Sequence, residues 1–197
     1  TPHIAFYRFR SDTHTDTLKI AHYDDSLGSW IVDPVLCNIQ GSIPVSLVLD
    51  SQDYPYIAHT VDIGLYCTWW DGTTWQSEYT GADLGWIGIR IALDLDSLDN
   101  PHIAYLPEPL IGRTCYCYKK DNVWHLCGWI ESDSSTLTID ADISFTLDRL
   151  DKPHVCYQFL SEHGADTTGI KYAKGTFVGV AEHKNGKLEK EFELQVF

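Results

Sequence analysis

A nine-residue motif recurs three times in this 197-residue chain and constrains its fold more than any other feature. The copies are Asp50–Ala58, Asp96–Ala104 and Asp148–Cys156, and the chain opens inside the same motif at Pro2. Its prolines, at positions 2, 55, 101 and 153, are 53, 46 and 52 residues apart. A near-constant period of this size indicates a repeat architecture, so we expect four units that start near residues 2, 45, 89 and 143.

Each unit has the pattern of four short strands. An alternating apolar run precedes the motif, a second run follows it, and a tryptophan comes after the next turn, at Trp30, Trp75 and Trp124. Four short antiparallel strands repeated at this spacing predict an all-β fold, a β-propeller with four blade-like sheets. The predicted organisation is propeller repeats over residues 1–178 and a linker with a C-terminal strand over residues 179–197.

The end of the chain has a strand pattern of its own. Phe192, Leu194 and Val196 alternate with polar residues, as in a half-buried strand that needs a sheet edge. The first unit lacks an opening strand, so the tail has two predicted partners. Pairing within the chain would close the ring, whereas pairing between chains would propagate a filament.

The unit L-x-L-D-S-x-x-x-P-H-I-A-Y, with a later L-x-Y and Trp, resembles repeats of secreted and surface β-propellers of bacteria and archaea. This resemblance covers residues 1 to 178 and implies an extracellular binding or structural module. Asp71-Gly72-Thr73-Thr74-Trp75 is similar to the turn of Asp-box propellers such as sialidases, although the full motif is absent. Residues 179–182 and the tail resemble a linker before a sorting domain. Since the chain also contains no Met, a fragment or a processed product is expected.

Charge and cysteine content limit the partners. A formal net charge of −14 argues against nucleic acid as a partner, and no apolar run reaches the ~20 residues of a membrane span. The six cysteines leave free thiols and disulfides both open. A two-residue turn within residues 119–122 would place Cys117 opposite Trp124 and Cys115 opposite Leu126, so we predict that Cys127 is bridged to neither cysteine.

Two sets of repeated side chains are candidate metal ligands. The motif aspartates could bind calcium, and Asp94, Asp96 and Asp99 form the best candidate cluster, although turn hydrogen bonds are the favoured role. His3, His102 and His154 occupy one repeat position and could converge on a metal. The favoured interpretation is that each histidine caps its turn by a hydrogen bond to a neighbouring strand.

The tryptophans give the candidate ligand surface. Trp30, Trp75 and Trp124 recur with the period and are expected to pack between sheets. Four others do not recur and are candidates for contact with a glycan or a protein: Trp69, Trp70, Trp86 and Trp129.

No catalytic or cofactor motif is present, so the sequence indicates no enzyme and no cofactor other than the candidate calcium. The predicted function is an extracellular structural or adhesive protein that acts through protein contacts and self-association. A lectin-like carbohydrate-binding module is the alternative, and a glycoside hydrolase is a third possibility.

Overall fold

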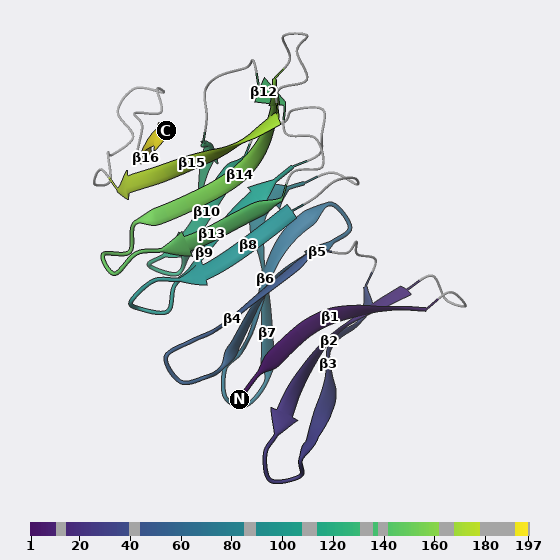
Figure 1. Cartoon of the computed structure of the whole chain (residues 1–197). Helices are drawn as coiled ribbons and strands as arrows, with labels where there is room; N and C mark the ends of the chain where they lie inside the picture. The colour runs from purple at the N-terminus through teal and green to yellow at the C-terminus, as the bar shows by residue number, and fades with distance from the viewer. Residues whose placement is uncertain are drawn as a thin grey trace. The chain divides into compact units, whose positions relative to one another are not determined.

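The computed structural model describes residues 1–10, 15–39, 44–84, 90–107, 114–130, 136–137, 142–161, 168–177 and 192–196. In these ranges the chain forms β-strands in four antiparallel sheets (Figure 1). The same ranges contain no helix long and apolar enough to cross a membrane. The chain divides into two compact units, Thr1–Trp86 and Ile87–Phe197.

The first unit contains the first and second sheets. The first sheet has the order β1-β2-β3, and its strands are β1 (His3–Arg10), β2 (Thr15–Asp24) and β3 (Ser29–Ile39). The second sheet has the order β4-β5-β6-β7, and its strands are β4 (Val45–Leu49), β5 (Pro55–Val61), β6 (Gly64–Trp70) and β7 (Trp75–Asp83).

The second unit contains the third and fourth sheets. The third sheet has the order β11-β10-β9-β8, with β8 (Arg90–Leu95), β9 (Pro101–Leu106), β10 (Cys115–Lys120) and β11 (Val123–Trp129). The fourth sheet has five strands: β12 (Thr136–Leu137), β13 (Ile143–Leu147), β14 (Pro153–Ser161), β15 (Thr168–Phe177) and β16 (Phe192–Val196).

The repeated motif folds into the predicted turn in all three copies. In the first copy the Asp50 carboxylate accepts the backbone N–H groups of Gln52 and Tyr54, both at 2.8 Å. Asp53 has a φ of 65°, a left-handed conformation that Asp tolerates better than most residues. The equivalent hydrogen bonds recur at Asp96 and Asp148, so the same local interaction sets the turn in all three copies of the motif.

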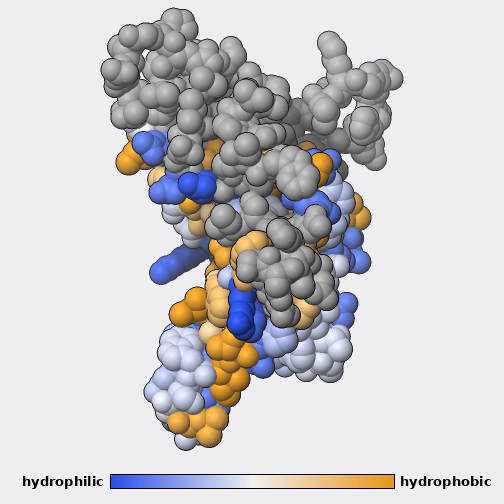
Figure 2. Space-filling view, turned by 90° about the vertical axis from the view of Figure 1, so that its right-hand side faces the viewer, coloured by the Kyte–Doolittle hydropathy of each residue, from blue (hydrophilic) through white to orange (hydrophobic). Residues whose placement is uncertain are grey.

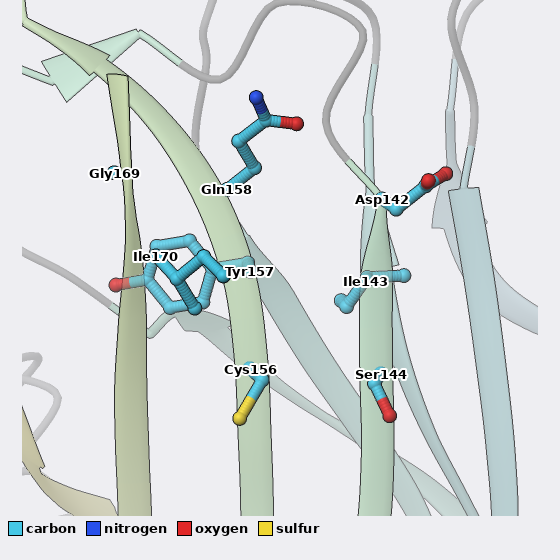
Figure 3. Close-up of a pocket in the computed structure, with 8 residues that line it drawn as sticks. All are labelled: Asp142, Ile143, Ser144, Cys156, Tyr157, Gln158, Gly169 and Ile170. Atoms are coloured by element: carbon cyan, nitrogen blue, oxygen red, sulfur yellow. The ribbon is translucent and has the colours of Figure 1, made fainter. Parts of the chain in front are cut away.

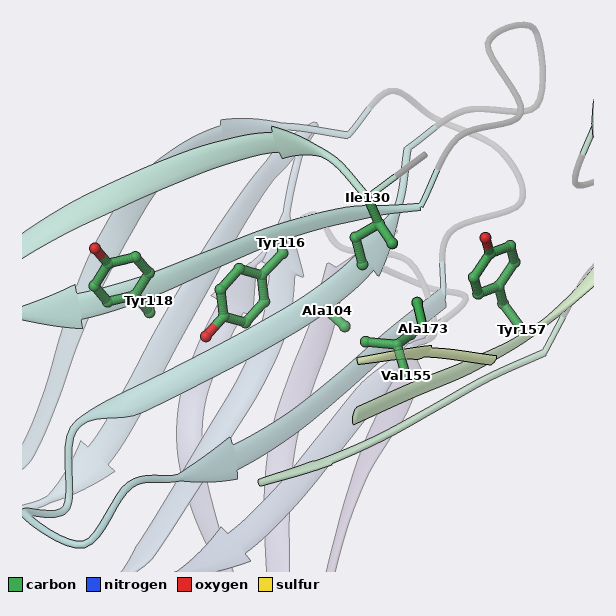
Figure 4. Packing of buried hydrophobic residues seen from close by; sticks show 7 residues of the cluster. All are labelled: Ala104, Tyr116, Tyr118, Ile130, Val155, Tyr157 and Ala173. Atoms are coloured by element: carbon green, nitrogen blue, oxygen red, sulfur yellow. The ribbon is translucent and has the colours of Figure 1, made fainter. Parts of the chain in front are cut away.

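Alternation along the strands directs one face of each sheet into a core between two sheets. In the first unit, Leu18, Ile20 and Val35 of the first sheet pack with Ile57 of the second. In the second unit, the core joins the third and fourth sheets (Figure 4). Its buried members are Ala104, Tyr116, Tyr118, Ile130, Val155, Tyr157 and Ala173. Each pair of sheets thus buries an apolar face that neither sheet could bury alone.

A hydrogen-bonded network of polar side chains also crosses the core of the first unit. The Tyr7 hydroxyl donates to the Thr60 carbonyl oxygen at 3.0 Å, so it accepts from His59 Nδ1 at 3.2 Å. His59 Nε2 therefore accepts from the Thr68 hydroxyl at 2.7 Å, and Thr68 Oγ1 lies 2.7 Å from Ser77 Oγ. His59 is fully buried, and this burial lowers its pKa to about 4. The network consequently holds a neutral imidazole.

The predicted β-propeller is wrong. The four sheets are separate and unequal, with three, four, four and five strands, and none is closed or curled into a ring of equal blades. The predicted tail strand exists as β16, but it pairs with β15 of the fourth sheet and does not close a ring on the first sheet. The repeat specifies strands, turns and faces, which are local properties, and these do not determine how successive sheets are arranged.

The predicted strand register around the cysteines is also wrong. Asp121 and Asn122 both have positive φ, at 50° and 63°, so they form the two-residue turn and pair Lys120 with Val123. Cys117 consequently lies opposite Leu126, and a bulge shifts Cys115 to a position opposite Trp129. All six cysteines are free thiols, including Cys127.

Candidate functional site

A cavity of about 500 Å³ in the first unit gathers aromatic, imidazole and carboxylate side chains. We call it the aromatic cavity. It is lined by His3, Ile20, His22, Asp33, Pro34, Pro55, Trp70 and Trp75. The first five of these residues come from the first sheet and the last three from the second, so the cavity lies between the two sheets of this unit.

Two histidines form one wall of the aromatic cavity. His3 begins β1 and lies directly opposite His22 on β2, and their rings stack with centroids 5.9 Å apart. His3 Nδ1 donates a hydrogen bond of 2.9 Å to the carbonyl oxygen of Thr1. In a neutral imidazole this arrangement makes Nε2 the acceptor, which could receive a hydrogen bond from a ligand.

Two tryptophans form the opposite wall. Trp70 ends β6 and pairs with Trp75 at the start of β7. The two rings meet edge to face, with centroids 5.6 Å apart and planes at 64°. Both side chains are half-buried, so each one keeps part of its surface accessible.

The tryptophan pair depends on the turn that joins β6 to β7. The Asp71 carboxylate accepts the backbone N–H groups of Thr73 and Thr74, both at 2.8 Å, and the Thr73 hydroxyl at 2.7 Å. The hydrogen bond from the Thr73 hydroxyl, with the two from backbone amides, holds the pKa of Asp71 well below its ordinary value. Asp71 is therefore a charged hydrogen-bond acceptor that stabilises the turn between the two indoles.

The remaining lining residues give the cavity a polar group and an apolar floor. Asp33 is exposed and lies on β3 directly opposite Ile20 of β2. Ile20 and Pro55 are buried. A mostly apolar concavity with a few oriented polar groups has the general composition of a small-molecule site. In the part of the chain that the structure describes, no Lys or Arg lines it.

A second cavity, of about 590 Å³, lies on the fourth sheet (Figure 3). It is lined by Asp142, Ile143, Ser144, Cys156, Tyr157, Gln158, Gly169 and Ile170. The Asp142 carboxylate pairs with Arg90 at 3.2 Å, and Tyr157 is the only aromatic residue among the described residues of the lining. This open groove therefore does not have the paired aromatic rings of the aromatic cavity.

Two of the three repeated histidines have the favoured capping role. His102 joins Asp96 of its turn, at 3.5 Å, to the Tyr116 hydroxyl on the next strand. His154 repeats the arrangement between Asp148, at 3.3 Å, and the Tyr172 hydroxyl. His3 differs, because it lines the aromatic cavity and bonds to Thr1.

The aspartates of these two turns remain charged. Burial acts to raise the pKa of Asp96, but hydrogen bonds from His102, Asn100 and two backbone amides outweigh it and lower the pKa to about 2. The Lys152 amide is the main cause of the equally lowered pKa of Asp148, also about 2. These carboxylates act as hydrogen-bond acceptors within their own turns.

The proposed calcium cluster is engaged in the same kind of bonding. Asp94 accepts the Thr146 hydroxyl at 2.9 Å and the Leu147 N–H at 2.8 Å, which links β8 to β13. Asp96 fixes its turn, and Asp99 has the left-handed φ of 61°. In the described part of the chain, no group of three His, Cys, Asp or Glu side chains is placed to hold a metal ion.

The tryptophans predicted from the sequence occupy different environments. Trp70 lines the aromatic cavity, whereas Trp69 is half-buried and stacks on Tyr56 with planes 13° apart. Trp86 lies outside the described residues, and Trp129 pairs with Cys115 through the β11 backbone. Of the recurring tryptophans, Trp75 packs against the core, but Trp30 is 45% exposed and does not fill the predicted position between sheets.

Sequence reasoning missed His22 and Asp33. Neither residue recurs with the repeat, so the periodicity gave no signal for them. The register of the β1–β2 hairpin, which pairs His3 with His22, could have found the first of them.

No family model matches the chain, and no curated protein does. Among solved structures, the chain is similar to a fucose lectin from Kordia zhangzhouensis in complex with methyl-fucoside. The sequence identity is 13%, the match covers 77% of this chain and 96% of that chain, and the TM-score is 0.45. A TM-score of this size does not give this chain the fold of the lectin, so the cavity is interpreted from its own residues.

Proposed function

We propose that the protein is a non-enzymatic carbohydrate-binding module and that the aromatic cavity of the first unit holds the saccharide. The observation that carries the proposal is the pairing of two indole rings with an imidazole pair and a carboxylate around one cavity of about 500 Å³. The proposal includes an extracellular or cell-surface location, where glycans are displayed.

The chemistry of a sugar ring fits these groups. A pyranose presents C–H groups on one face, which pack on an indole, and hydroxyl groups at its edge, which need hydrogen-bond partners. The Asp33 carboxylate accepts hydrogen bonds from hydroxyls, and His3 Nε2 is positioned by the Thr1 contact to do the same. An aromatic wall facing polar groups is therefore suited to an amphipathic ring.

Charge narrows the class of saccharide. The described lining residues include Asp33 but no Lys or Arg, and the whole chain has a net charge of −14. An anionic sugar would be repelled by this field and would find no arginine to bind its carboxylate. We therefore propose neutral saccharides as the ligands.

The same residues favour binding over hydrolysis. A glycosidase of the usual kind places two carboxylates on either side of the scissile bond. Among the described residues that line the aromatic cavity, Asp33 is the only carboxylate. A bound saccharide would accordingly be released unchanged.

The experiment is a glycan array followed by calorimetry on the neutral saccharide that gives the strongest signal. Trp70→Ala removes one indole of the wall and is expected to weaken binding at least tenfold, about 1.4 kcal/mol or more. Trp69→Ala is the matched control, because this neighbouring indole on β6 stacks on Tyr56 and does not line the cavity. Circular dichroism verifies that both variants are folded.

The two variants separate a specific site from a general effect. The proposal requires that Trp69→Ala keeps the affinity of the unsubstituted protein within about twofold. Absence of binding to any neutral glycan, or equal losses in both variants, would overturn the proposal.

A further inference from the structure

Both units pack their sheets by the same rule, which the repeat motif makes visible. In the motif Pro-His-Ile-Ala, the third and fourth residues point to opposite faces of the sheet. We call these the Ile face and the Ala face. In the first unit, Ala5 of the first sheet and Ile57 of the second belong to one core, so an Ala face packs on an Ile face.

The second unit repeats this pairing. Ala104 presents the Ala face of the third sheet, and Val155, at the Ile position, presents the Ile face of the fourth sheet. Both residues are fully buried in one core (Figure 4). An Ala face on an Ile face is therefore the packing mode of this chain in two independent places.

One Ile face and one Ala face, each equivalent to a buried face in another sheet, are exposed to solvent. On the Ile face of the first sheet, Ile4 is 51% exposed. Val32, which pairs with Ala21, the β2 partner of Ile4, is 46% exposed. Figure 2 shows hydrophobic side chains at the surface in the lower part of the view, at the height of the first sheet in Figure 1. The equivalents of Ile4 in the other core-forming sheets, Ile57 and Val155, have no exposure.

On the Ala face of the fourth sheet, Cys156 is exposed and Ile170 is 79% exposed. This face carries the open groove of about 590 Å³ (Figure 3). Its equivalent in the third sheet, at Ala104, is completely covered by the fourth sheet. The chain thus exposes one face of each type that it packs together internally.

We propose that a second copy of this chain is the occupant of both faces: the Ala face of the fourth sheet packs on the Ile face of the first sheet of the next copy. The packing within the chain supports this pairing, because an Ala face meets an Ile face in both cores.

The contact is heterologous, because two different surfaces meet. Each added copy leaves one Ile face and one Ala face exposed, so association continues beyond a dimer unless the copies close into a ring. Every copy also has a net charge of −14, and this repulsion is screened by salt. Association is therefore expected to increase with protein concentration and with ionic strength.

The test is analytical ultracentrifugation of the full chain at 0.5 M NaCl, without saccharide and with a reducing agent that keeps Cys156 from cross-linking. The unsubstituted protein is expected to form species at multiples of 22.4 kDa that grow with concentration. Ile4→Lys and Ile170→Lys each place a charge on one face and are expected to weaken association at least tenfold, leaving monomers. Leu98→Lys is the control, because Leu98 is 79% exposed in the β8–β9 turn and is a residue of neither face.

Mixing the two interface variants distinguishes this contact from a symmetric one. Ile4→Lys keeps an intact Ala face and Ile170→Lys keeps an intact Ile face, so an equimolar mixture is expected to form a 1:1 dimer and no longer species. A monomeric unsubstituted protein at all concentrations, or a mixture that stays monomeric, would overturn the proposal. Because saccharide is absent from the experiment, its outcome is independent of the proposed carbohydrate binding.

Discussion

Lowering the pH from 6.5 to 4 is expected to reduce the free energy of unfolding of the first unit by about 3 kcal/mol through His59 alone. The pKa of His59 is about 4 in the folded protein, whereas an exposed histidine has 6.5. Between these values the unfolded state binds a proton that the folded state excludes, so stability is complete above pH 6.5 and decreases as the pH approaches 4. The folded state excludes the proton because His59 is fully buried and desolvation disfavours the charged ring.

Urea unfolding followed by tryptophan fluorescence measures this effect, because five of the seven tryptophans precede residue 87. The control is His59→Gln, whose amide can still bond to Thr68 but does not titrate. Other groups contribute equally to both proteins, so the difference between their pH dependences isolates His59. A parallel pH dependence of the two proteins, or an NMR titration of His59 with a midpoint near 6.5, would contradict the buried neutral network.

Removing the buried side chain at the Ile position of the second sheet is expected to have a comparable effect. Ile57 is fully buried in the core between the first two sheets, so Ile57→Ala should reduce the free energy of unfolding by about 2–5 kcal/mol, from lost transfer energy and a cavity. Ile4→Ala makes the same chemical change at the equivalent repeat position. Since Ile4 is 51% exposed, the expected loss is at most about 1 kcal/mol.

The comparison is made by urea unfolding in dilute protein at low salt, where association does not add to the measured stability. Equal losses at the two positions would mean that Ile4 is covered as fully as Ile57. That result would contradict the face assignment on which the sheet-packing rule depends.

The parts of this fold that could be predicted from the sequence are those fixed by neighbouring residues. The Asp50, Asp96 and Asp148 turns followed from Asp chemistry, since each carboxylate bonds to amides two and four residues later. The strands around each turn followed from alternation. The capping role of His102 and His154 could also be predicted from repetition, but His3 at the same repeat position bonds to Thr1 instead.

The parts that could not be predicted depend on registers and on sheet-to-sheet placement. One misplaced turn residue moved Cys117 from Trp124 to Leu126, since Asp121 and Asn122 both adopt the left-handed conformation. The predicted propeller was wrong for a related reason. The motif specifies which faces of each sheet are apolar, but not whether successive sheets close into a ring. Of the residues that line the aromatic cavity, Trp70 and His3 were candidates from the sequence, whereas His22 and Asp33 join it through strand pairing.

The most direct test of carbohydrate binding in the aromatic cavity is a ¹⁵N-¹H NMR titration that follows the indole N–H signals of the tryptophans. The titrant is the neutral saccharide that binds best on the array. The account predicts that the signals of Trp70 and Trp75 shift in proportion to occupancy, while those of Trp30, Trp69 and Trp124 stay within the line width. Shifts confined to other tryptophans would place the site elsewhere, and saturation without a shift of Trp70 or Trp75 would contradict the proposed site.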